Sequence, residues 1–325
     1  MPREEIHVEG RTVDVHLLRV APVRGEPVIL VPGLAAAPRA YELNPVRSLV
    51  STLHARGRTP WLVDFQLHWR SNDQGADALL HALEVALSEL RRHIGDDLEH
   101  VDAVGHSLGG ILLLALAADG VPLRRIVTLA SALDYRNGKA PLPRLLSLAP
   151  RGLRPLRPGF RRGGLPTTRI ATMASSLFGR DLGLPVERDQ YHADSTPPDI
   201  KRQNLREGVR DIPLALLLDL ADLFTEEGLH LGAQGRPLRE AVGDLRQPVL
   251  MVAARQDRQC PLEAVRAAAR RIPGARLLEV GGEGGPGEGY GHVDVLTGAR
   301  AAVEVFDPVA DFLGPAAAGG AGGSP

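Results

Sequence analysis

The sequence predicts an α/β protein built on a doubly wound, mostly parallel sheet. Short, continuously apolar segments, typical of strands buried on both faces, recur along the chain. Segments with helical spacing of apolar residues separate them. This alternation occupies both ends of the 325-residue chain and is interrupted once, between about residues 131 and 247. Strands that alternate with helices in this way form a parallel sheet covered by helices on both faces.

Each core element is predicted from the spacing of its apolar residues and from the residues at its two ends. An alternation of polar and apolar residues around Gly10 predicts a β-hairpin over residues 5–17. Apolar runs predict strands at 27–31, 61–65, 101–105, 125–130, 248–253 and 275–280. Apolar residues at helical spacing predict helices at 47–56, 76–94, 108–118, 262–271 and 303–313.

The interruption is expected to be a helical insertion, or cap, over the carboxyl edge of the sheet. It begins with basic residues that have no acid between them: Arg136, Lys139, Arg144, Arg151, Arg154, Arg157, Arg161 and Arg162. Such a run is typical of a solvated surface, and binding of anionic lipid or carboxylate substrates is the alternative. An apolar helix is expected over 212–220, where it either lines an acyl-chain pocket or packs the cap onto the core.

These segments give three expected regions. Residues 1–131 and 248–313 form the core, residues 132–247 form the cap, and residues 314–325, rich in Ala and Gly, form a disordered tail. No internal repeat is apparent.

Composition limits the possible functions. Hydrophobic residues make up 44% and charged residues 24%, the balance of a globular protein with a large core. Lys and Arg number 38 against 39 Asp and Glu, so no global field favours nucleic acid as a partner. The single cysteine, Cys260, excludes an intrachain disulfide and a multi-cysteine metal site, and we expect no metal and no cofactor.

Two observations concern membranes. No apolar run approaches the roughly 20 residues that a membrane span needs. The first residues lack a basic segment followed by an apolar one, the pattern of a secretory signal. A cytoplasmic protein without a membrane span is therefore expected.

Residues 105–110 (GHSLGG) contain the motif G-x-S-x-G between a predicted strand and a predicted helix. In so tight a turn Ser107 has a strained backbone, and side chains at Gly105 and Gly109 would collide with neighbouring backbone. The Ser107 hydroxyl then stands at the N-terminus of the helix as a nucleophile. The alternative, in which Ser107 only caps the helix, does not require glycine on both sides. His106 is expected to face away from the site and to pack in the core.

A serine hydroxyl is a weak nucleophile, and it needs a base that a carboxylate orients. In one known chain order of such triads the serine comes first, the acid second and the histidine last. Asp257 lies in a loop between a strand and a helix, and His292 is the one histidine that follows it. Asp134, after the strand at 125–130, is the alternative acid. Asp257 as an ordinary turn aspartate and His292 as an ordinary loop histidine are the competing interpretations.

The oxyanion that forms during acyl transfer needs two preorganised donors. The backbone N–H of Leu108, directly after the nucleophile, is the first candidate. The loop after the strand at 27–31 supplies the second, because Gly33 allows a close approach to Ser107 and the N–H of Leu34 follows it. An ordinary turn at the end of the strand is the alternative for this loop.

Taken together, these residues resemble the α/β-hydrolase family over nearly the whole chain. Residues 31–34 (VPGL) are similar to its oxyanion loop and residues 105–109 (GHSLG) to its nucleophile elbow. Asp257 and His292 stand at positions similar to those of its acid and its base. The resemblance implies an eight-stranded sheet with the cap inserted after the sixth strand.

Two subgroups of the family are more closely similar. Residues 292–302 resemble the region around the catalytic histidine of polyhydroxyalkanoate synthases and acid lipases, and residues 41–43, 47–49 and 133–135 also resemble the synthases. Those synthases have cysteine at the elbow, where this chain has Ser107. The difference favours ester hydrolysis over thioester-linked polymerisation.

The sequence therefore predicts a serine hydrolase, esterase- or lipase-like, that cleaves carboxylic esters through an acyl-serine intermediate. Its partner is expected to be a small-molecule acyl ester. The alternatives are an acyltransferase or a polyhydroxyalkanoate synthase- or depolymerase-like enzyme with the same triad, and a catalytically silent member of the fold that binds a ligand.

Overall fold

A single large sheet organises the protein, whose structure is a computed structural model. The structure describes residues 3–43, 48–68, 75–95, 101–136, 164–168, 185–283, 285 and 287–314. The strands of the sheet are β1 (Arg3–Val8), β2 (Val13–Val20), β3 (Pro27–Val31), β4 (Thr59–Leu67), β5 (Asp102–His106), β6 (Arg125–Leu129), β9 (Val249–Ala254) and β10 (Arg276–Val280).

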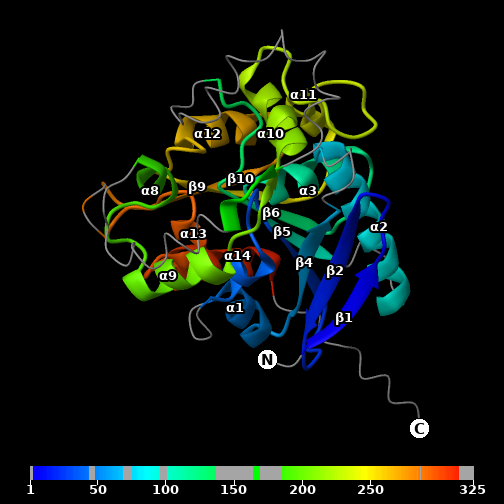
Figure 1. Cartoon of the computed structure of the whole chain (residues 1–325), viewed down its shortest axis with the longest axis horizontal. Coiled ribbons are helices and arrows are strands. Elements are labelled where there is room, and N and C mark those ends of the chain that lie inside the picture. The colour runs from blue at the N-terminus through cyan, green and yellow to red at the C-terminus, as the bar shows by residue number, and fades with distance from the viewer. Residues whose placement is uncertain are drawn as a thin grey trace.

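These strands lie side by side in the order β1-β2-β4-β3-β5-β6-β9-β10 (Figure 1). The β1–β2 and β2–β4 pairs are antiparallel, and all the other neighbouring pairs are parallel. The predicted, mostly parallel sheet of eight strands is therefore confirmed. Because β3, β5, β6 and β9 are parallel neighbours, the loops that follow them lie at one edge of the sheet.

Helices cover both faces of this sheet. They are α1 (Leu49–Ala55), α2 (Ala76–Ile94), α3 (Leu108–Ala118), α12 (Leu262–Arg271), α13 (Asp294–Thr297) and α14 (Asp307–Leu313). One hydrophobic cluster joins α2, α3 and α12 to the sheet, and a second joins α1 and α14 to the opposite face. In β3, Ile29 and Val31 belong to the first cluster, whereas Val28 and Leu30 belong to the second. Burial on both faces explains why this strand is continuously apolar.

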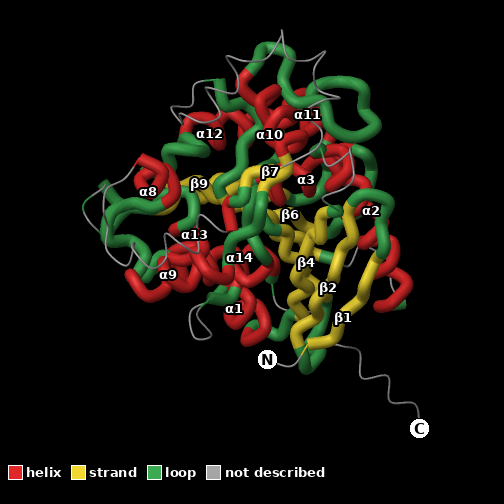
Figure 2. The backbone as a smooth tube through the Cα atoms, in the orientation of Figure 1, coloured by secondary structure: helices red, strands yellow, loops and turns green. Residues whose placement is uncertain are grey.

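Between β6 and β9 the chain forms a series of smaller elements. They are β7 (Gly164–Leu165), α8 (Pro185–Gln190), α9 (Pro198–Glu207), β8 (Ile212–Pro213), α10 (Leu214–Leu220) and α11 (Leu238–Ala241). Figure 2 shows α8 and α9 beside α13, and α10 and α11 near α3. The rest of the basic run, residues 139–162, and the tail at 315–325 lie outside the described residues.

The apolar helix predicted over 212–220 begins later than predicted. Ile212 and Pro213 form the short strand β8, paired with β7, and the helix starts at Leu214. Proline holds its preceding residue in an extended conformation, which explains the late start. In this helix Leu216 and Leu217 are buried, and Leu216 belongs to the cluster around α2 and α3. Leu216 therefore packs onto the core, the second of the two predicted roles.

The last predicted helix, 303–313, also differs in detail. Its first turn is a π-helix, Ala302–Phe306, and α14 follows directly. Pro308 stands in the first turn of α14 and has no N–H to donate to the preceding turn, which accounts for the change in hydrogen bonding there.

A cluster of buried charges joins the starting ends of several strands. Asp102, fully buried, accepts hydrogen bonds from Arg124 Nε at 2.9 Å and Arg124 Nη2 at 2.6 Å. Arg58, 1% exposed, also donates to Asp102, and it donates to Glu26 at 2.7 Å. Burial lowers the pKa of Arg58 to about 10. This cluster lies at the end of the sheet opposite the loops that carry the candidate site.

Candidate active site

Ser107 occupies a strained turn between β5 and α3. Its φ of 52° and ψ of −117° place a non-glycine residue in a region that L-residues rarely adopt. A Cβ atom on Gly105 would lie 2.4 Å from the backbone of Gly109, and one on Gly109 would lie 2.1 Å from the carbonyl oxygen of Val31. The predicted steric need for both glycines is therefore present in the structure.

The Ser107 side chain does not cap α3. It makes no capping hydrogen bond, and its Oγ lies 2.9 Å from Nε2 of His292. A simple N-cap serine would instead accept a backbone N–H from the first helical turn. The backbone of Ser107 is fixed separately, since its N–H donates to Leu129 and its carbonyl accepts from the Ser131 hydroxyl.

His292 lies between Ser107 and Asp257. Its Nδ1 is 2.8 Å from Oδ2 of Asp257, and both side chains come from loops that follow β10 and β9. The carboxylate can only accept, so Nδ1 carries the proton and Nε2 accepts the hydrogen bond from the Ser107 hydroxyl. Each of the two residues is 5% exposed. The structure thus brings together the three residues that the sequence predicted as a triad.

Asp257 is itself held by the backbone. Its Oδ1 accepts the N–H groups of Gln259 and Cys260, each at 2.8 Å, which leaves Oδ2 directed at His292. The alternative acid, Asp134, is paired with Arg136 at 2.6 Å. Of these two candidate acids, Asp257 is therefore the one whose carboxylate contacts His292 in this structure.

The predicted oxyanion loop lies against the elbow. A Cβ atom on Gly33 would come within 3.0 Å of the Ser107 Cβ, so the loop passes in close contact with the nucleophile. Leu34 follows Gly33, and Ala35 has a φ of 57° that turns the chain. Leu108 is the first residue of α3, directly after Ser107. Both candidate donor residues therefore flank the serine.

Tyr41, which the sequence analysis did not select as a site residue, joins this loop to the elbow. Its hydroxyl donates to the Val31 carbonyl at 2.7 Å and accepts the N–H of His106 at 3.0 Å. At this point β3 and β5 are connected through a side-chain oxygen. A tyrosine separated from the elbow by 65 residues gives no local sequence signal of such a contact.

His106 differs from expectation. It is buried, but it does not face away from the site, because its Nε2 lies 3.0 Å from the His292 carbonyl oxygen. The carbonyl can only accept, so Nε2 carries a proton. Burial lowers the pKa of His106 to about 3, and the ring is neutral. The predicted packing of His106 is confirmed by its burial, but the ring lies against His292, with the two ring centroids 5.0 Å apart.

Metal ligands are not gathered anywhere in the described ranges: no group of three or more His, Cys, Asp or Glu side chains there could hold an ion. Cys260 is buried, and the Tyr135 hydroxyl lies 3.4 Å from its sulfur. Among the described residues, no helix is both long and apolar enough to cross a membrane.

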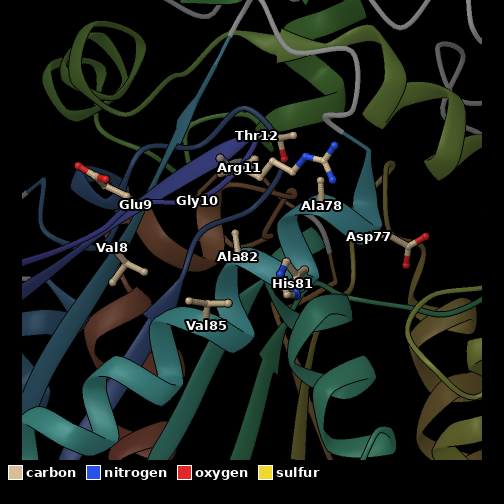
Figure 3. Close-up of a pocket in the computed structure, with 11 residues that line it drawn as sticks. Val8, Glu9, Gly10, Arg11, Thr12, Asp77, Ala78, His81, Ala82 and Val85 are labelled. Atoms are coloured by element: carbon tan, nitrogen blue, oxygen red, sulfur yellow. The ribbon is translucent and has the colours of Figure 1, made fainter.

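A groove of about 660 Å³ lies away from Ser107, between the turn that joins β1 to β2 and the first half of α2 (Figure 3). It is lined by Val8, Glu9, Gly10, Arg11, Thr12, Val13, Asp77, Ala78, His81, Ala82 and Val85. None of these residues contributes to the cluster around Ser107.

The fold and the site together define a class of protein. A mostly parallel sheet carries a serine on a strained strand-to-helix turn, and later loops bring a histidine and an aspartate to it; this is the architecture of an α/β hydrolase. The sequence matches the model of the Alpha/beta hydrolase family over residues 28–305. The chain therefore belongs to this family, as the resemblance predicted.

Several solved structures have a similar fold. A hydrolase from Pseudomonas aeruginosa PA01 is 14% identical, with a TM-score of 0.59 over 96% of this chain and 98% of that one. The esterase EaEST from Exiguobacterium antarcticum is 14% identical, with a TM-score of 0.59 over 93% and 96%. A bromoperoxidase from Bacillus anthracis is 14% identical, with a TM-score of 0.60 over 96% and 99%. At these identities the likeness shows the fold alone. No curated protein sequence matches the chain.

Proposed function

We propose that the protein is a serine hydrolase that cleaves small carboxylic esters through an acyl-Ser107 intermediate. The observation that carries the proposal is the continuous chain from Asp257 through His292 to Ser107, with contacts of 2.8 Å and 2.9 Å. Membership of the α/β hydrolase family and a fold shared with esterases support the choice of reaction. We also propose that the segment between β6 and β9 is the cap of this fold.

Acylation begins when Ser107 Oγ attacks the ester carbonyl carbon. His292 Nε2 takes the hydroxyl proton, and the imidazolium is stabilised and oriented by Asp257. The tetrahedral intermediate then collapses, the bond to the alkoxy oxygen breaks, and His292 returns the proton to the departing alcohol. The acyl group remains as an ester on Ser107.

The negative oxygen of the intermediate needs donors that are already in place. We assign this role to the backbone N–H groups of Leu108 and Leu34. Leu108 begins an eleven-residue helix, whose N-terminal dipoles add to the positive potential at the site.

Deacylation repeats the sequence with water. His292 Nε2 removes a proton from the water, the hydroxide oxygen attacks the acyl carbon, and the proton passes to the departing Ser107 Oγ. A carboxylic acid leaves and the free serine is restored. If an alcohol takes the place of water, the same steps transfer the acyl group to that alcohol.

Labelling with a fluorophosphonate tests the nucleophile. We expect the wild type to gain one covalent adduct, located at Ser107 by mass spectrometry, and Ser107→Ala to gain none. Ser88→Ala is the matched control, since Ser88 lies on the exposed side of α2 and its hydroxyl donates to the Glu84 carbonyl. A folded wild type that does not label, or equal labelling of Ser107→Ala, excludes the proposal.

Product analysis separates hydrolysis from transfer. With p-nitrophenyl esters of graded chain length we expect free acid as the main product even when an alcohol is added. A new ester as the main product would instead identify an acyltransferase.

A further inference from the structure

Asp294 is a buried carboxylate that the reaction above does not use. It stands two residues after His292, at the start of α13, and its side chain is fully buried. Burial raises the pKa of Asp294 to about 6, so the group is largely ionised at neutral pH. A buried carboxylate is retained only where hydrogen bonds compensate for its lost hydration.

The compensating donors come from two distant parts of the chain. Oδ2 of Asp294 accepts the backbone N–H of Gly291 at 2.7 Å, on the residue directly before His292. The same oxygen accepts the backbone N–H of His192 at 2.6 Å, and Oδ1 accepts the Thr196 hydroxyl. One side chain thus joins the loop of His292 to residues 190–197 of the insertion.

Further hydrogen bonds join the same two segments, the loop of His292 and residues 190–197. The N–H of Val293 donates to the Gln190 carbonyl at 2.9 Å, and the N–H of Ala299 donates to the Ser195 carbonyl at 2.8 Å. A Cβ atom on Gly291 would lie 2.8 Å from the His192 nitrogen, which shows how closely the two segments pass. The backbone on both sides of His292 is therefore supported by the insertion.

We propose that Asp294 is a positioning residue for His292: its carboxylate holds the loop of the base against residues 190–197, and so fixes the imidazole between Asp257 and Ser107. The inference rests on the proposed function, because it assigns His292 as the base. A displacement of about 1 Å in a catalytic group lowers the rate by about 100-fold, so the support of this loop is directly relevant to turnover.

Two substitutions of Asp294 separate the effect of its hydrogen bonds from the effect of its side-chain volume. Asp294→Asn keeps an oxygen for the two backbone donors and places an NH₂ group toward Thr196. The Thr196 hydroxyl can then donate to Thr297, whose oxygen lies 2.7 Å away. Asp294→Ala removes all three acceptor contacts. We expect the Ala variant to lose about 100-fold in kcat with KM within about twofold, and the Asn variant to stay within about threefold of wild type.

The low-field proton resonance of His292 Nδ1–H, shared with Asp257, is a readout that does not depend on turnover. We expect it to disappear or move in Asp294→Ala and to persist in Asp294→Asn. Asp119→Ala is the matched control, because Asp119 also accepts an insertion N–H, that of Ala233 at 3.0 Å, but at the far end of α3. This control should leave both kcat and the resonance unchanged.

Each outcome supports or contradicts a different part of the proposal for Asp294. A folded Ala variant with unchanged kcat and resonance overturns the role of Asp294. An Asn variant as impaired as the Ala variant overturns positioning through hydrogen bonds and assigns the effect to the charge. Should Asp294→Ala fail to fold, Thr196→Val removes a single donor, and we expect a several-fold lower kcat; an unchanged kcat there counts against the proposal. A wild type that fluorophosphonate does not label defeats the hydrolase function, whereas the resonance still tests Asp294.

Discussion

Asp257 uses its two carboxylate oxygens differently. Oδ1 accepts two backbone N–H groups and Oδ2 contacts His292. The backbone contacts therefore fix which oxygen faces the imidazole. An amide at this position must keep its oxygen toward the two backbone donors, which directs its NH₂ group at Nδ1 of His292.

From this geometry we predict that Asp257→Asn reverses the tautomer of His292. With Nδ1 accepting, Nε2 carries the proton and cannot take one from Ser107. We expect kcat to fall by about 10⁴-fold, a loss typical of such a change in a serine triad. Ester hydrolysis at neutral pH measures it, and Asp134→Asn, paired with Arg136 instead of His292, should remain within about twofold. Equal losses in both variants would contradict the assignment of the acid.

Asp294 also makes the free energy of unfolding depend on pH. Its pKa in the folded protein, about 6, lies above the ordinary value of 3.8 because of burial. Folding thus favours the protonated form, and the contribution of Asp294 to the free energy of unfolding is greatest below about pH 4 and is lost as pH rises through about 6. The span from 3.8 to about 6 corresponds to roughly 3 kcal/mol.

We therefore expect Asp294→Asn to gain stability relative to wild type, by up to about 3 kcal/mol, as pH rises from 4 to 7. Urea unfolding of both proteins at several pH values measures this difference. His192, Tyr191 and Tyr290, the other titratable side chains that interact with Asp294, are retained in the variant and cancel in the comparison. Parallel pH curves for the two proteins would exclude the effect.

The sequence was informative about some residues of the site and silent about others. Ser107 was predictable because its turn has a steric signature, and Asp257 and His292 because chain order left few candidates. The contacts of Tyr41 and His106 depend on tertiary packing across 65 and 186 positions, which no local pattern records. The roles of Leu34 and Leu108 as donors stay predictions.

At the scale of elements, hydrophobic period predicted helices and strands well where the chain is regular. The helices at 76–94, 108–118 and 262–271 have the predicted bounds. The differences occur at two prolines, although apolar spacing continues through both. Pro213 holds Ile212 in an extended conformation, and Pro308 lacks the N–H that would bond to the preceding turn. The spacing of apolar residues predicts which side chains are buried. At a proline, the local backbone conformation can differ although the same side chains are still buried.

The buried charge cluster at the start of β5 gives an element-scale prediction. Asp102→Ala leaves Arg58, 1% exposed, and Arg124 without the carboxylate between them. We expect a loss of about 3 kcal/mol in the free energy of unfolding, because the buried Arg58 and its neighbour Arg124 then share Glu26 alone as a carboxylate partner. Urea unfolding checks it. Asp244→Ala, which removes an exposed ion pair with Arg236, should change stability by less than about 1 kcal/mol; similar losses in the two variants would refute the prediction.

At the scale of the whole molecule, the insertion is joined to the core on two sides of the site. Residues 190–197 bond to the loop of His292, and after α9 the N–H of Ala37 donates to the Gly208 carbonyl at 2.9 Å. The N–H of Arg210 donates to the Ala35 carbonyl at 2.8 Å. One continuous segment, residues 190–210, thus runs from the loop of His292 to the predicted oxyanion loop.

This connection predicts that residues 190–210 open together with the core. Hydrogen exchange in low concentrations of denaturant should show peptides from 190–210 and from 287–299 losing protection in the same transition, since shared hydrogen bonds make one cooperative unit. Peptides from the hairpin turn near Gly10 serve as the rapidly exchanging reference. Opening of 190–210 at a distinctly lower denaturant concentration would show instead a cap that moves on its own.

The phenol of Tyr41 affects how the contact between β3 and β5 responds to pH. Its proton has one available direction, toward Val31, because the amide of His106 already occupies the oxygen from the other side. Burial raises the pKa of this hydroxyl far above its ordinary value of 10. The hydroxyl of Tyr41 therefore stays protonated at neutral pH, and its bridge between β3 and β5 persists where the predicted oxyanion loop begins.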